Sequence, residues 1–317
     1  MTEHVIAAHG LGRTFEVRRR SGGLRRTRET RNAVVDLDLL VAPGEMVGYL
    51  GPNGAGKSTT VKMFTGILHP TAGRLRVCGL DPVRERTRLA RRIGVVFGQR
   101  STLWWDLPLR DSFDLLRRIY RVPAVRYAQN LATFTELLDL GEQLDTPVRQ
   151  LSLGQRMRGD ITAALLHDPE VLFLDEPTIG LDVVSKGRLR EFLRQLNAEQ
   201  GTTLVLTTHD LGDVEALCDR VAVIDHGTKV FDGSLADLRG LGGAPRTLRV
   251  DLVDEAPPIR VPGTTVRRVE GARQWLEFPA EQSAAPLIAA VVEAHEVADL
   301  SLLEPDVEAV VRQIYSR

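Results

Sequence analysis

A chain of 317 residues exceeds one average domain, so we expect one large domain plus an appendage. Its 43% hydrophobic and 26% charged residues are ordinary for a globular protein and exclude a disordered one. No run approaches the ~18 consecutive apolar residues of a membrane span, and the opening MTEHVIAAHG lacks the pattern of a signal peptide, so we expect a protein that does not itself cross a membrane. Cys78 and Cys218 form no CxxC pattern, which argues against a cysteine metal site and fits a reducing cytoplasm.

Basic charge gathers near the start of the chain. The net charge is −1, yet residues 18–31 (RRRSGGLRRTRETR) carry seven arginines against Glu29, a net +6. We expect this segment to be a loop joining strands at 4–16 and 32–42. Such a loop is either simply solvated or held near anionic lipid headgroups or an acidic partner. Nucleic acid is not the expected partner, because the basic charge is confined to this one segment.

A phosphate-binding motif follows the second strand. An apolar run at 45–50 ends in GPNGAGKS, residues 51–58, which matches GxxxxGK[ST] between a predicted strand and a predicted helix. Glycines let successive backbone N–H groups wrap phosphates, and the helix N-terminus adds partial positive charge. Lys57 would supply a full charge to the β- and γ-phosphates, and the Ser58 hydroxyl would bind Mg²⁺. The expected phosphate-binding residues are Gly51, Pro52, Asn53, Gly54, Ala55, Gly56, Lys57, Ser58 and Thr59.

Buried strands then alternate with helices. The pattern predicts helical stretches at 109–140 and 152–166 and apolar strands at 171–175, 204–208 and 221–224. This alternation predicts an α/β fold with a parallel sheet, in which ligands bind at the carboxyl ends of the strands.

The apolar strand VLFLD would deliver two carboxylates to that edge. Asp175, its last residue, would hold Mg²⁺, and Glu176 would polarise an attacking water. Two buried carboxylates without cations would be costly, so a purely structural role is not expected.

Over residues 4–235, the chain resembles the nucleotide-binding subunit of an ATP-binding-cassette (ABC) transporter. Gln99 in VVFGQR resembles the glutamine that senses Mg²⁺ and the lytic water. His209 in LTTHD resembles the switch histidine that contacts the γ-phosphate of ATP. Phe15 stands where the family places an aromatic ring to stack on adenine. The resemblance implies ATP and Mg²⁺ as cofactors.

LSLGQ, residues 151–155, resembles the family signature, and IGLD, residues 179–182, resembles its D-loop, which ends at Asp182. In the family, the signature serves the nucleotide of the other protomer, a role implied here for Ser152, Gly154 and Gln155. Leu153 replaces the first glycine of the commoner LSGGQ and could alter dimer affinity. Each motif occurs once, so the resemblance implies a homodimer with ATP between two chains.

Small GTPases and kinases would lack the signature and switch histidine, and translation-factor relatives carry two cassettes. The resemblance therefore implies an ATPase subunit that powers transport through separate membrane subunits by ATP-driven dimerisation. GPNGAGKSTT, GLDVV and FGQRSTLWWDLP resemble drug- and antibiotic-exporter cassettes. The alternative is a non-transport ABC ATPase acting as a regulatory or nucleic-acid-associated module.

Trp104 and Trp105 are adjacent, so a regular helix or strand cannot direct both into one core. In the ABC transporter cassettes that this chain resembles, the region after the glutamine loop receives a helix of the membrane subunit. We therefore expect Trp104 and Trp105 to contact that subunit, with packing of one of them in the helical core as the alternative. The protein would be cytoplasmic and peripheral on the inner face of the cell membrane.

The expected fold class is thus an α/β, ABC-type P-loop core with an antiparallel β subdomain and a helical signature subdomain at about 100–165. We expect residues 1–239 to form this nucleotide-binding domain. GLGGAP at 240–245 reads as a linker, and residues 240–317 as a small α+β domain in the order β-β-β-α-β-α. A regulatory and a dimer-stabilising role for that domain are both open.

Overall fold

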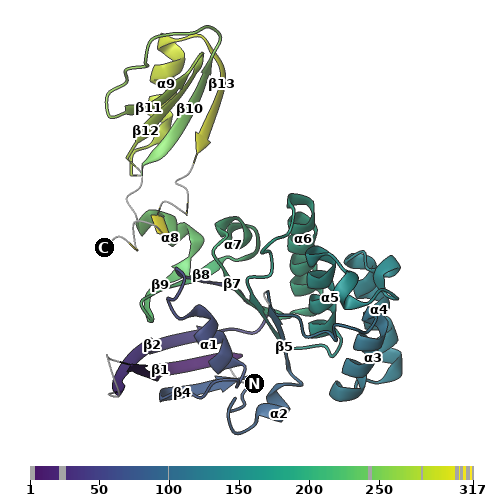
Figure 1. Ribbon diagram of the computed structural model, residues 1–317. Helices are drawn as coiled ribbons and strands as arrows, with labels where there is room; N and C mark the ends of the chain where they lie inside the picture. Colours follow the sequence, from purple (N-terminus) through teal and green to yellow (C-terminus); the bar gives the residue numbers. More distant parts are fainter. Residues whose placement is uncertain are drawn as a thin grey trace. The chain divides into compact units, whose positions relative to one another are not determined.

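The computed structural model describes residues 4–20, 26–98, 100–241, 245–279 and 281–303, together with Val307, Val310, Val311 and Tyr315. For residues 17–20 and 26–29 only the backbone is described. The chain forms two compact units, Met1–Asp232 and Gly233–Arg317 (Figure 1). The boundary expected at 239/240 lies inside helix α8, Leu235–Leu241, within the second unit.

A six-stranded sheet in the order β5-β6-β7-β3-β8-β9 runs through the first unit (Figure 1). The strands from β5 to β8 are parallel. Because helices cover both faces of such a sheet, its strands are continuously apolar, as VLFLD is, and the predicted parallel α/β core is confirmed. The bounds are β3 Met46–Leu50, β5 Ile93–Phe97, β6 Val171–Asp175, β7 Thr203–Thr208, β8 Arg220–Asp225 and β9 Thr228–Ser234.

An antiparallel sheet in the order β2-β1-β4 packs beside it, and one apolar core that includes Phe64 joins the two sheets. Pairing of β1 with β2 continues to Arg20 opposite Arg26. The prediction of a loop at residues 18–31 is therefore wrong for residues 18–20 and 26–31, which are strand. Residues 21–25 lie outside the described part of the chain. An antiparallel ladder is held by main-chain hydrogen bonds, which a run of arginines does not remove. The bounds are β1 Ile6–Arg20, β2 Arg26–Val41 and β4 Ala72–Val77.

Helices make up the rest of the first unit. The helical stretch predicted at 109–140 is divided, because Arg121 has a left-handed φ of 58° and Pro123 begins a new helix. Among the described residues, no helix is both long and apolar enough to span a membrane. The bounds are α1 Lys57–Phe64, α2 Arg86–Leu89, α3 Leu109–Tyr120, α4 Ala124–Leu137, α5 Leu153–Leu165, α6 Val183–Gln200 and α7 Leu211–Leu217, with short 3₁₀ turns at Gly141–Gln143 and Val148–Gln150.

The second unit contains an antiparallel sheet in the order β11-β12-β10-β13, with α9 packed on one face. Alternation in RTLRVDL buries Leu248, Val250 and Leu252 against that helix. The predicted order β-β-β-α-β is confirmed. Of the last predicted helix, Val307, Val310, Val311 and Tyr315 are helical, and its other residues lie outside the description. The bounds are β10 Arg246–Leu252, β11 Thr265–Glu270, β12 Arg273–Phe278, α9 Ala284–Ala294 and β13 Val297–Leu303.

Candidate active site

The phosphate loop turns directly from β3 into α1. Gly54 and Gly56 have φ values of 84° and 110°, which side chains rarely adopt. A Cβ at Gly56 would also lie only 2.3 Å from the Ala33 carbonyl oxygen. Gly56 is the N-cap of α1 and has no side chain to cap it. The first N–H groups of α1 are thus available to an anion such as a nucleotide phosphate.

Lys57 is buried within this loop. Its Nζ donates to the Gly51 carbonyl at 2.5 Å and reaches the Pro52 carbonyl at 3.4 Å. Burial lowers the pKa of Lys57, while the negative charges of Glu176 and Asp175 act in the opposite direction. The loop therefore holds a desolvated cation that would attract phosphate oxygens.

Asp175 ends β6 beside the first turn of α1. Its Oδ1 accepts a hydrogen bond from Ser58 Oγ at 3.3 Å and another from the Thr207 hydroxyl. A carboxylate next to a hydroxyl offers the hard oxygen ligands that Mg²⁺ prefers, so these residues fit that ion. Gln99, the third expected Mg²⁺ ligand, lies outside the described residues.

Glu176 and His209 extend from neighbouring strands. The Glu176 backbone N–H donates to the Thr207 carbonyl oxygen at 2.8 Å, which holds the residue after β6 against β7. Glu176 has a left-handed φ of 57°, a costly conformation for a non-glycine residue. Its Oε2 lies 2.8 Å from Nδ1 of His209. The pair can position a water and contact a terminal phosphate.

These residues share one cleft of about 860 Å³ at the carboxyl edge of the sheet. Its lining joins the phosphate loop to the ends of β6 and β7 and to the antiparallel sheet. The cleft is also lined by Arg31, Lys62 and Arg100, which were not expected there. Arg31 was counted only in the basic segment 18–31, and the signal of Lys62 and Arg100 was their charge near a motif. The predicted residues brought together here are Phe15, Pro52, Asn53, Gly54, Gly56, Lys57, Ser58, Thr59, Asp175, Glu176 and His209.

Phe15 forms one end of the cleft. The Arg13 guanidinium lies 4.6 Å from the centre of its ring, and Nη1 of Arg13 donates to the His69 carbonyl at 2.8 Å. Arg13 therefore covers one face of the aromatic ring. The ring is half-buried and lines the cleft, where it could stack on a nucleobase.

The signature residues do not line this cleft in their own chain. Ser152 caps α5 in a capping box with Gln155. A Cβ on Gly180 would lie 2.3 Å from Cδ2 of Leu153, so the leucine occupies space that this glycine leaves free. The signature and the D-loop are consequently packed together within one chain, and Asp182 caps α6 by accepting from Ser185.

Trp104 and Trp105 are 38% and 53% exposed, whereas the preceding Leu103 is buried. Arg156 of α5 lies 5.6 Å from the centre of a Trp105 ring. Leu103 alone of the three supplies a buried side chain to this subdomain, packing beside Gly159. The exposed parts of both rings leave apolar surface on this subdomain.

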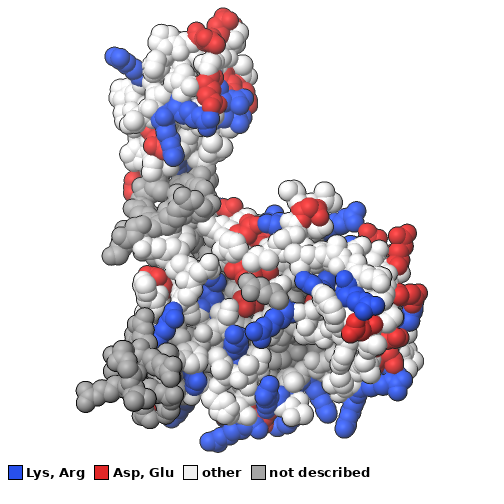
Figure 2. Space-filling model, in the orientation of Figure 1, with Lys and Arg blue, Asp and Glu red and all other residues white. Residues whose placement is uncertain are grey.

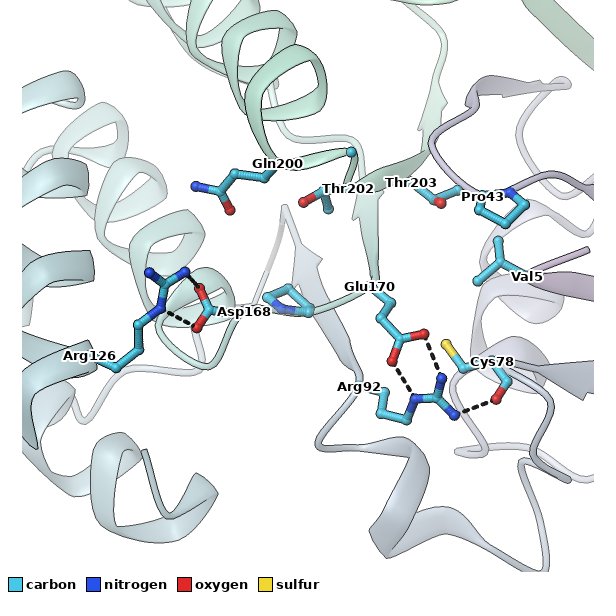
Figure 3. Close-up of a pocket in the computed structure, with 12 residues that line it drawn as sticks. Val5, Pro43, Cys78, Arg92, Arg126, Asp168, Glu170, Gln200, Thr202 and Thr203 are labelled. Carbon is cyan, nitrogen blue, oxygen red and sulfur yellow. Dashed lines mark hydrogen bonds and ion pairs between the residues drawn. The ribbon is translucent and has the colours of Figure 1, made fainter. Parts of the chain in front are cut away.

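A second cavity, of about 460 Å³, opens at the amino edge of the same sheet (Figure 3). Arg92 is bound by Glu170 and by the Cys78 carbonyl, and Arg126 makes two 2.7 Å contacts with Asp168. Both guanidinium groups are thus neutralised by carboxylates. Burial raises the pKa of the Cys78 thiol to about 12, so it is not a nucleophile at neutral pH. The cleft at the opposite edge is therefore the candidate active site.

Comparisons with known proteins place these features in a wider context. The family described as ABC transporter matches residues 34–179. The daunorubicin resistance ATP-binding protein of Streptomyces coeruleorubidus is 40% identical over 216 residues, 68% of each chain. A Nod factor export ATP-binding protein I of Cupriavidus metallidurans is 36% identical over 267 residues, 82% of this chain and 85% of that protein. A dimeric ATP-binding cassette solved in a post-hydrolysis state with ADP and phosphate has a TM-score of 0.63 at 26% identity, and the match covers 73% of this chain and 98% of that one.

Proposed function

Because the chain belongs to the ABC transporter family, as an ATP-binding subunit that hydrolyses ATP, we propose that it powers export through separate membrane subunits. The observation that carries the proposal is one cleft that joins Lys57, Asp175, Glu176 and His209. The relatives named for drug resistance and Nod factor export favour the outward direction. Neither is named as a nucleic-acid-associated protein. Acidic and basic side chains are also interspersed on the visible face of the first unit, unlike a nucleic-acid footprint (Figure 2).

In the proposed reaction, the phosphate loop and Lys57 bind the β- and γ-phosphates of ATP. Ser58 and Asp175 would hold Mg²⁺, with Gln99 as the remaining expected ligand, and the ion would neutralise negative charge on the phosphates. Glu176 orients a water and accepts its proton as the water oxygen bonds to the γ-phosphorus and the bond to ADP breaks. His209 contacts the γ-phosphate, and Phe15 stacks on adenine.

A second copy completes each site. The signature residues Ser152, Gly154 and Gln155 lie outside their own cleft, so they would contact the γ-phosphate in the partner's cleft. Val183 and Val184 follow Asp182 and are 86% and 67% exposed, as expected of residues that an interface covers. The solved relative described above is dimeric.

The membrane subunits would bind at Trp104 and Trp105, because exposed aromatic side chains serve as interface anchors. This contact would hold the protein on the inner face of the cell membrane. Residues 240–317 would have either a regulatory or a dimer-stabilising role, and their place in a separate compact unit supports a distinct function.

The experiment is reconstitution with candidate membrane subunits, in vesicles that carry the cassette on the outside. ATP and a mixture of candidate cargo molecules are added outside, and the lumen is analysed by mass spectrometry. Export predicts ATP-dependent accumulation in the lumen, absent with Glu176→Gln. ATP-dependent loss of preloaded cargo from the lumen would instead identify an importer.

A further inference from the structure

A buried ionic cluster joins α6, α7 and the segment that follows Glu176. Asp213 of α7 is 0% exposed, and both of its carboxylate oxygens have partners. Arg190 of α6 donates to Oδ1 through Nε at 2.8 Å and Nη2 at 2.5 Å, and the Thr178 hydroxyl donates to Oδ2. A carboxylate without a cation at this depth would be strongly destabilising, so Arg190 is required by Asp213.

A second ion pair joins the same two helices one turn away. Lys186 Nζ donates to Asp210 Oδ2 at 2.5 Å, and Arg190 approaches the other oxygen at 3.8 Å. Asp210 Oδ1 accepts from the Gly212 N–H at 3.1 Å and thereby caps α7. Since Lys186 and Arg190 are four residues apart, they lie on one face of α6, which packs against α7 (Figure 1).

Two partners in these contacts lie close to Glu176 and His209 in the sequence. Thr178 lies two residues after Glu176, at the entry to the D-loop, and Asp210 directly follows His209. The face of α6 therefore binds the segment after His209 directly, through Lys186 and Asp210. It reaches the segment after Glu176 through Asp213, which binds both Arg190 and Thr178. Asp182, the last residue of the D-loop, is the N-cap of α6.

We propose that Arg190, Asp213 and Thr178 are positioning residues that hold His209 against Glu176 and link this pair to the D-loop. Engagement of the D-loop by a second copy is thereby transmitted through α6 to the switch histidine. The inference rests on the proposed roles of Glu176 and His209. A purely structural cluster would stabilise α6 against α7 without affecting turnover once that stability is restored.

The test removes the whole cluster at once. Replacing a buried ion pair by apolar residues of similar size often preserves stability, so the triple variant Thr178→Val, Arg190→Met, Asp213→Leu removes the positioning contacts without leaving a buried charge. Arg194→Met is the matched control, because Arg194 also joins α6 to α7, through the Ala216 carbonyl at 2.8 Å, but at the far end of α7. Melting temperature, ATP KM and kcat are measured for each variant.

We expect the triple variant to keep the ATP KM within about twofold, because the phosphate loop is untouched, while kcat falls ~10- to 100-fold through misplacement of the catalytic pair. The control keeps wild-type kcat. In a His209→Ala background the triple substitution should cause no further loss, since its effect passes through His209.

A triple variant with wild-type kcat would overturn the inference, as would an equal additional loss in the His209→Ala background. If the triple variant does not fold, the single variants Arg190→Lys and Asp213→Asn take its place. The kcat of each is compared with wild type, and the effect of each is measured again in the His209→Ala background. Wild-type turnover in both Glu176→Gln and His209→Ala would defeat the proposed function itself, a separate outcome from failure of this cluster.

Discussion

Nδ1 of His209 lies 2.8 Å from Oε2 of Glu176, and the backbone N–H of His209 approaches the same oxygen at 3.4 Å. The two residues follow β6 and β7, which are neighbouring parallel strands. A carboxylate and an imidazole are therefore in contact within a single chain. In the proposed dimer, a second copy would need only to add its signature residues to a pair that is already formed.

Replacement of Lys57 by Ala should abolish detectable nucleotide binding. The phosphates would lose a full charge inside a partly desolvated loop, where such a charge is worth more than in water. Binding of a fluorescent ATP analogue measures the effect. Lys229→Ala is the control, because Lys229 pairs with Asp232 outside the cleft. Undiminished binding in Lys57→Ala would contradict the role given to the loop.

Phe15→Ala should weaken ATP binding, because base–aromatic stacking is worth about 1–3 kcal/mol, or roughly 5- to 150-fold in affinity. Phe15→Tyr keeps an aromatic ring and should retain most of the affinity. Titration calorimetry with ATP and with inorganic triphosphate separates the cases, since triphosphate has no base to stack. A loss of equal size for both ligands would show that Phe15 acts on the fold of the loop.

The double variant Trp104→Ala, Trp105→Ala should fold normally but fail to assemble with membrane subunits. Truncating an aromatic anchor commonly costs ~2 kcal/mol or more, about thirtyfold in affinity. Leu103→Ala is the matched control: its side chain is buried, so it should lower the melting temperature instead. Pull-down and thermal melting measure the two effects. A large fall in melting temperature for the tryptophan variant would show that those side chains support the fold.

Much of the catalytic edge could be predicted, because short-range rules set it. GPNGAGKS has the glycines that its φ values require, and VLFLD is apolar because both sheet faces are covered. Because the carboxyl ends of parallel strands meet at one edge of the sheet, the residues that end β6 and follow β6 and β7 lie close together there. These residues are Asp175, Glu176 and His209.

Other features depend on contacts that no local pattern shows. Residues 18–20 and 26–31 form strand because their backbones pair, although the arginines resemble a solvated loop. Asp213, Arg190 and Thr178 meet only after α6 packs on α7, and each alone reads as an ordinary surface residue. The burial of Leu103 beside two exposed tryptophans likewise depends on the space left by Gly159.

His167 should make stability depend on pH. Its Nε2 contacts the Ile93 carbonyl at 2.9 Å, and its ring stacks on Tyr120 at 4.0 Å. Burial lowers the pKa of His167, opposed by the Ile93 hydrogen bond and the charge of Asp168. As pH falls, the unfolded chain therefore binds this proton before the folded chain does. His167 thus contributes to the free energy of unfolding above pH ~6.5, and this contribution is lost as pH falls through the folded-state pKa.

In His167→Gln this loss should be reduced, giving a flatter dependence of the free energy of unfolding on pH below ~6.5. Urea titrations across that range measure it, with His69→Gln as the control at an exposed position. An unchanged slope in His167→Gln would assign the dependence to other groups.

The turnover of Glu176→Gln, measured together with its ATP affinity, tests the central claim most directly. Glutamine keeps the shape of the side chain but cannot accept the proton of the attacking water, so kcat should fall by ~10² or more. ATP should still bind, and light scattering should show an ATP-dependent dimer. Turnover equal to wild type, with ATP bound as tightly, would contradict the assignment of Glu176 as the base.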